Sequence, residues 1–106
     1  MLNKDTEDFL DRVSNIDWKT KIERALKLCE EAGEVAGAVL SSENVSAAGY
    51  KGLTEADVVE ELVDVYICLR ALLLKYDHSA DMLDAIATRK LQKWETALYK
   101  VMGPLT

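Results

Sequence analysis

The sequence predicts an all-α fold: a helical bundle of three long helices and one shorter N-terminal helix, in a single domain over residues 1–106. One proline and five glycines in the whole chain leave little to interrupt helices. Apolar residues recur at helical spacing, and no segment alternates as a strand would. Residues suited to capping stand where these segments begin.

The first two helices follow from these signals. A short helix is expected over residues 5–13, with Phe9, Leu10 and Val13 facing inward. Thr20 and Glu23 have the spacing of a capping box, so the second helix begins there and runs to about residue 40. Its apolar stripe comprises Ile22, Ala25, Leu26, Cys29, Ala32, Ala36 and Val39.

The second half of the chain holds two more helices. A loop over residues 41–53, rich in Ser, Ala and Gly, is followed by a cap at Thr54 and a helix to about residue 76. Its run VVEELVDVYICLRALLLKY is apolar nearly all the way round, which is typical of a buried helix. A last helix is expected after residue 79 and should stop at Gly103-Pro104.

Composition excludes several classes of protein. Thirteen basic and nineteen acidic residues give a net charge of −6, which argues against a nucleic-acid polymer as partner. Charged residues at the start of the chain argue against a signal peptide, and no apolar run is long enough for a bilayer. Cys29 and Cys68 lack zinc-like spacing, so we expect reduced thiols and a cytoplasmic location.

Two acidic pairs carry the functional signal. Glu31 with Glu34, and Glu61 with Asp64, are spaced to lie on one side of a helical turn. Glu61 and Asp64 fall among apolar residues, where two carboxylates need more than one neutralising charge. We therefore favour a divalent metal over an ion pair with a lysine or arginine. Oxygen ligands favour Mg²⁺, with Mn²⁺ as an option, and the single histidine, His78 in a turn, argues against di-iron.

On the second helix the interpretation stays open. Glu30, Glu31 and Glu34 lie mostly opposite the apolar stripe, so a solvated charged face is an alternative to a ligand set. Gly33 and Gly37 each cost about 1 kcal/mol relative to alanine inside a helix. Close approach of another helix, or room for a ligand, would explain them.

These acidic motifs resemble a known family. The segment LCEEAGEVAGAVL and the later VVEELVDVYICL carry Glu30-Glu31-Ala-Gly-Glu34 and Glu61-Leu-Val-Asp64. This pattern resembles the EExxE…ExxD signature of the MazG-like all-α nucleoside triphosphate pyrophosphohydrolases. The resemblance covers most of the chain.

The resemblance implies a reaction and its residues. Such enzymes cleave a nucleoside triphosphate, here expected to be a deoxynucleotide, to monophosphate and pyrophosphate by attack of water at the α-phosphorus. House-cleaning of the nucleotide pool is a role that fits this reaction. Glu31, Glu34, Glu61 and Asp64 match the Mg²⁺ ligands, and Glu30 is a candidate for activating the water.

The resemblance also implies contacts to the rest of the nucleotide. Arg89, Lys90 and Lys93 compete for the basic phosphate contact on the last helix, although Lys93 or Trp94 stands where an asparagine is usual. For Lys90 the alternative is a side chain that reaches past Trp94 into solvent. Trp18 is a weak candidate for stacking on the base, and a hydrophobic staple at the helix start is the alternative.

Assembly and rival functions complete the expectations. A short chain with an all-apolar helix should bury part of it against another copy. The resemblance implies that this assembly is a homodimer or homotetramer. One rival is a related pyrophosphohydrolase with another substrate, such as phosphoribosyl-ATP. The other is a non-catalytic helical interaction module whose acids form a solvated or ion-paired face.

Overall fold

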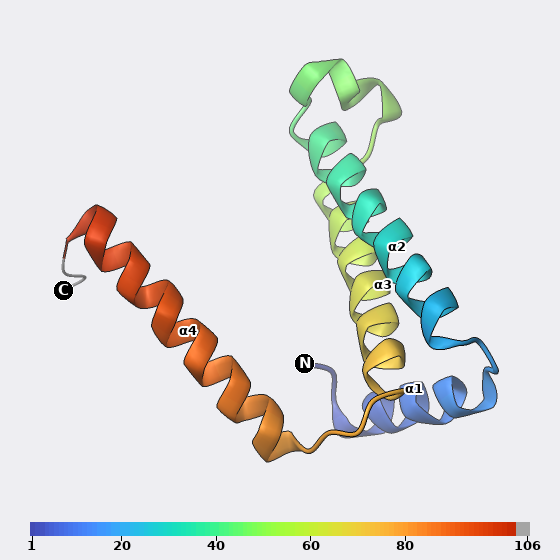
Figure 1. The fold of residues 1–106 in the computed structure, drawn as a ribbon. Coiled ribbons are helices and arrows are strands. Elements are labelled where there is room, and N and C mark those ends of the chain that lie inside the picture. Colours follow the sequence, from blue (N-terminus) through green and yellow to red (C-terminus); the bar gives the residue numbers. More distant parts are fainter. Residues whose placement is uncertain (104–106) are drawn as a thin grey trace. The chain divides into compact units, whose positions relative to one another are not determined.

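The computed structural model describes residues 1–103, apart from the side chain of residue 46, and the described residues contain helices and no strand (Figure 1). The predicted all-α class, with three long helices and a shorter first one, is confirmed. The elements are α1 (Lys4–Ile16), α2 (Lys21–Ser42), the 3₁₀ helix η1 (Val45–Lys51), α3 (Glu55–Leu73) and α4 (Ala80–Met102). The expected loop over residues 41–53 thus contains a helix of its own.

The chain forms two compact units, one of residues 1–76 and one from residue 77 onward. In the first unit α2 and α3 run antiparallel and are joined through η1 (Figure 1). Helix α1 packs against α3 at the opposite end of the pair. The regular structure of the second unit is α4. A single domain over the whole chain stays a prediction.

Local side-chain chemistry sets where the two central helices begin. The Thr20 hydroxyl accepts from the Glu23 backbone N–H at 3.2 Å, and the Glu23 carboxylate accepts from the Thr20 N–H at 3.0 Å. Thr54 and Asp57 make the same reciprocal pair at the start of α3, at 3.4 and 2.7 Å. Both predicted caps are confirmed, because these contacts depend only on residues three apart.

The core is small, and α3 is not buried within its own unit, contrary to the expectation from its sequence. No residue of α3 is buried there, and the buried hydrophobic residues among those described are Leu10 and Ala38. Phe9 and Val13, expected to face inward, are 58% and 51% exposed. One antiparallel neighbour and one short crossing helix cover only one side of α3, so the first unit leaves the other side of this helix uncovered.

Helix α2 packs through a side of mixed polarity that lies away from its apolar stripe. Arg24, Ala38 and Ser41 are its buried residues, whereas Ile22 and Leu26 of the apolar stripe are 73% and 67% exposed. The stripe therefore exists as a feature of the helix, but nothing in its own unit covers it.

The two glycines of α2 are not explained by close packing inside the chain. A Cβ added at Gly33 or Gly37 would meet no other atom within 4 Å. The expected close approach of another helix is absent from the first unit, and no residue of that unit fills the space beside the two glycines.

Two expectations from composition can also be compared with the structure. Cys29 and Cys68 are free thiols, as predicted. Among the described residues, no helix is both long enough and apolar enough to cross a membrane.

Candidate metal centre

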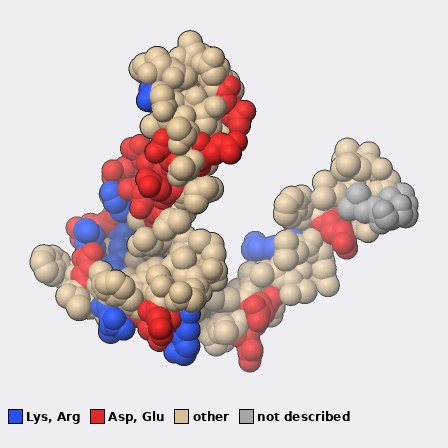
Figure 2. Space-filling view, turned by 180° about the vertical axis from the view of Figure 1, so that it is seen from behind, with Lys and Arg blue, Asp and Glu red and all other residues tan. Residues whose placement is uncertain are grey.

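Three carboxylates meet where α2 and α3 lie side by side. One oxygen each from Glu31 on α2 and from Glu61 and Asp64 on α3 lie within 4.8 Å of one another. Glu31 and Glu61 are half-buried and Asp64 is exposed. Figure 2 shows acidic side chains gathered over the part of the molecule formed by α2 and α3. We call these three residues the carboxylate group.

The group forms because of spacing within each helix and the antiparallel pairing between them. Glu61 and Asp64 are three residues apart, so both lie on one side of α3. Glu31 lies near the middle of α2, on the side that faces α3, where only 13% of its side chain is exposed. The side of α2 that packs against α3 thus brings Glu31 to the two acids of α3.

Electrostatics within the group oppose full ionisation. The pKa of Glu61 is raised above the ordinary value of 4.5, first by burial and then by the negative charges of Asp64, Glu34, Glu31 and Glu60. Oxygen ligands at this density are the donor set that Mg²⁺ or Mn²⁺ prefers. A divalent cation would remove the repulsion that raises this pKa.

One lysine reaches the group from the side. Lys27 Nζ lies 3.0 Å from Glu31 and 3.4 Å from Glu30, and the hydrogen bond to Glu31 is the main reason that the Lys27 pKa is raised. Among the described residues, Glu61 and Asp64 form no ion pair. The ion-paired alternative therefore applies to one carboxylate of the three.

Two further acids were expected at the site. Glu34 is exposed and lies outside the carboxylate group, although its charge contributes to the raised pKa of Glu61. Glu30 is also exposed and is held by Lys27. The structure thus brings three of the four expected ligands together, and the roles of Glu34 and Glu30 stay predictions.

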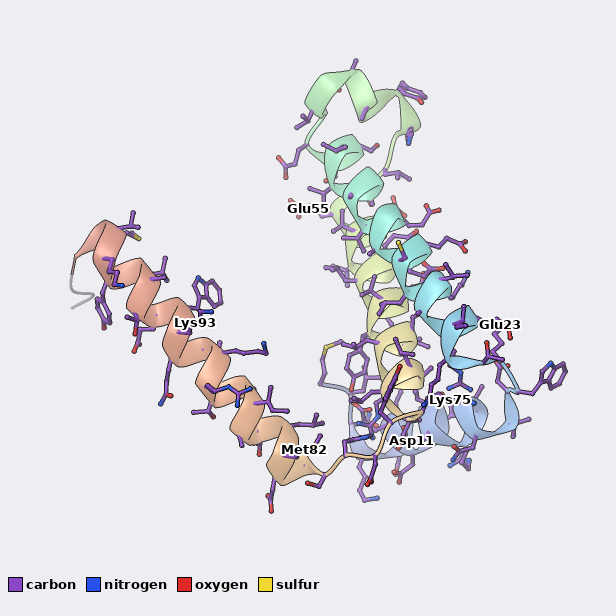
Figure 3. The ribbon with its side chains drawn as sticks, in the orientation of Figure 1. Asp11, Glu23, Glu55, Lys75, Met82 and Lys93 are labelled. Carbon is purple, nitrogen blue, oxygen red and sulfur yellow. The ribbon has the colours of Figure 1, made fainter. Side chains whose placement is uncertain are left out.

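The expected phosphate and base contacts lie elsewhere in the chain. Arg89, Lys90 and Lys93 are exposed on α4, which belongs to the second unit, and Figure 3 labels Lys93 there. That one of these three residues contacts phosphate stays a prediction. Trp18 is 90% exposed beside an open depression of about 420 Å³ in the first unit, so the hydrophobic staple is wrong and base stacking stays a prediction.

The sequence reading missed Arg24. This side chain is 5% exposed and donates to the backbone carbonyls of Ala71, Ser14 and Asp17 at 2.5, 2.6 and 2.9 Å. It joins the turn after α1 to the end of α3. The available signal was its position three residues before Lys27 and seven before Glu31, which places all three on the same side of α2.

Comparisons with protein-family models, with curated proteins and with solved structures find no match. The site is therefore interpreted from its own residues and from the motif resemblance given above.

Proposed function

We propose that this protein is a Mg²⁺-dependent nucleoside triphosphate pyrophosphohydrolase. It converts a nucleoside triphosphate, preferably a deoxynucleotide, to the monophosphate and pyrophosphate. The observation that carries the proposal is the convergence of Glu31, Glu61 and Asp64 from two helices to within 4.8 Å. These are three of the residues that the EExxE…ExxD resemblance assigns to the metal.

Each acidic residue of the two motifs has a role in this reaction. Glu31, Glu61 and Asp64 hold the cation, and Glu34 lies close enough to add its negative charge. When bound, Mg²⁺ supplies charge neutralisation for the triphosphate and for its transition state. Glu30 is adjacent in sequence to Glu31 and solvent-exposed, so its carboxylate can orient a water molecule and accept its proton.

A non-catalytic interaction module is the second candidate. It is favoured by the 3.0 Å ion pair between Lys27 and Glu31 and by the exposure of Asp64. In that function the acids would be a charged surface that needs no metal.

Incubation with a panel of nucleoside triphosphates and Mg²⁺ tests the reaction. We expect pyrophosphate as the product, because attack at the α-phosphorus releases the two outer phosphates together. Orthophosphate as the sole product, or no turnover of any member of the panel, would contradict the proposal.

A pair of variants tests the site. Glu61→Gln should lower kcat/KM by more than about 100-fold, because partners one step removed from a metal ligand already contribute about 10–100-fold. Glu55→Gln is the matched control, since Glu55 is exposed at the start of the same helix and outside the carboxylate group (Figure 3). Equal activities of the two variants would refute the assignment, provided circular dichroism shows that both are folded.

Thermal unfolding separates the two candidate functions. Mg²⁺ at about 100 times its Kd should stabilise the fold by about 2.7 kcal/mol, which raises Tm by several degrees. Sodium chloride at matched ionic strength is the control, because it screens a charged surface without binding a site. An equal rise of Tm in both salts would favour the interaction module.

A further inference from the structure

A basic cavity adjoins the carboxylate group. It has a volume of about 190 Å³, and its lining combines the apolar Val13, Ile67 and Ala71 with three cationic side chains and one carboxylate: Lys19, Arg24, Lys27 and Asp17. The Asp17 carboxylate is engaged by Lys19, through the backbone N–H at 3.0 Å and through Nζ at 3.2 Å. In a chain with a net charge of −6, this concentration of positive charge is unusual.

Arg24 is the deepest of these cations. Its guanidinium is surrounded by the neutral carbonyl groups of Ser14, Asp17 and Ala71, and its Nε has no hydrogen-bond partner in the described structure. The nearby Asp17 carboxylate has a pKa that is lowered first by its hydrogen bonds with Lys19 and last by the charge of Arg24, and its salt bridge is with Lys19. A buried guanidinium whose Nε lacks a hydrogen-bond partner is costly, and a bound anion would stabilise it.

Lys27 and Cys68 connect this cavity to the carboxylate group. Lys27 lines the cavity and also lies 3.0 Å from Glu31. Cys68, one turn after Asp64, lines it too, and its pKa is raised first by burial and then by the charge of Glu31. An anion in the cavity would therefore lie next to the carboxylates.

We propose that this cavity is the subsite for the outer phosphates of the triphosphate, with Arg24 and Lys27 as donors. The proposal rests on the proposed function and assigns the pyrophosphate half of the substrate to a place on this chain. The volume would hold several water molecules at about 30 Å³ each, and hence a phosphoryl group. When the Glu31 carboxylate binds a cation, Lys27 loses the closer of its two carboxylate partners, and its flexible ammonium can turn from the exposed Glu30 to phosphate.

Binding of inorganic pyrophosphate in the presence of Mg²⁺, measured by titration calorimetry, tests the subsite without requiring turnover. Lys27→Gln should weaken binding by about tenfold or more, the usual value of a hydrogen bond to a charged group. Lys51→Gln makes the same change of net charge on the exposed surface of η1 and should leave binding unchanged. Mn²⁺ affinity, titrated separately, should be maintained in both variants.

The two cysteines give a second readout. Pyrophosphate with Mg²⁺ should suppress alkylation of Cys68, which lines the cavity, and leave that of Cys29, which is exposed and does not line it. Peptide mass spectrometry reports both thiols in one sample.

The outcomes separate the subsite from the activity. Equal pyrophosphate affinities of the Lys27→Gln and Lys51→Gln proteins, a parallel loss of Mn²⁺ affinity in Lys27→Gln, or unprotected Cys68 would overturn the subsite even in an active enzyme. Weakened binding in Lys27→Gln together with protection of Cys68, in a protein that hydrolyses no triphosphate, would support the subsite and remove the proposed function.

Discussion

At the scale of single residues, two half-buried glutamates show how surroundings decide the state of a carboxylate. Glu7 accepts a hydrogen bond from the Tyr66 hydroxyl, and this is the main reason that its pKa is lowered. Glu61 is surrounded by other acids, and its pKa is raised by burial and by their charges. The first environment favours the ionised carboxylate in the folded protein, whereas the second disfavours it. A locally unfavourable arrangement of this kind is typical of a functional site.

Replacing Glu61 with glutamine should raise Tm at neutral pH in the presence of EDTA. The folded-state pKa of Glu61 lies above its unfolded value, so the folded protein binds more protons between the two values. Stability therefore falls as pH rises through that window, and the variant should lack this fall. Tm measured for both proteins from acidic to neutral pH checks the prediction, since the contribution of Glu7 is common to both. A lower Tm of the variant at neutral pH would show that the Glu61 charge stabilises the fold.

At the scale of the helices, the sequence predicted what depends on near neighbours. The caps at Thr20 and Thr54 and the stop before Gly103 agree with the structure, because each depends on contacts within about one turn. The side of α2 that packs could not be predicted in this way. Periodicity identifies the side that should be covered, but α3 instead contacts the opposite side, where Arg24 is buried. That choice depends on contacts such as Arg24 with Ala71, which are distant in sequence.

The cap of α3 should be worth a measurable part of the stability. Thr54→Ala removes the hydroxyl that accepts from Asp57 and should cost about 1 kcal/mol. Thr96→Ala is the matched control, because the Thr96 hydroxyl donates to the Gln92 carbonyl within α4, an interaction that stabilises little. Urea unfolding gives both values. A loss at Thr96 as large as that at Thr54 would show that capping is not the cause.

At the scale of the whole molecule, apolar surface exceeds what the first unit covers. Hydrophobic residues make up 49% of the sequence, yet Leu10 and Ala38 are the buried ones among the described residues. Along α2 the exposed apolar stripe passes Gly33, where an added Cβ meets nothing within that unit. A continuous apolar face of this kind favours self-association. We therefore propose that the protein functions as a homodimer or homotetramer.

A charge placed on the stripe should disrupt such an assembly. Leu26 is 67% exposed in its own unit, so Leu26→Glu should leave the fold of that unit intact but shift the sedimentation coefficient toward the monomer. Tyr50→Glu, at an 84% exposed residue of η1, is the control. A wild-type protein that sediments as a monomer at every concentration, with a Tm independent of concentration, would contradict the assembly.

Gly33→Ala tests the same face through the sign of its effect. Within the first unit the new methyl group meets no atom, so on an uncovered α2 helix propensity alone would stabilise the variant by about 1 kcal/mol. Where a second copy packs closely on α2, the methyl group opposes that contact and Tm falls instead. We expect Tm to fall, because close packing of a second copy would explain a glycine that otherwise only weakens the helix. Thermal unfolding at low and high protein concentration should show the loss growing with concentration, and a uniform gain would place Gly33 on a free surface.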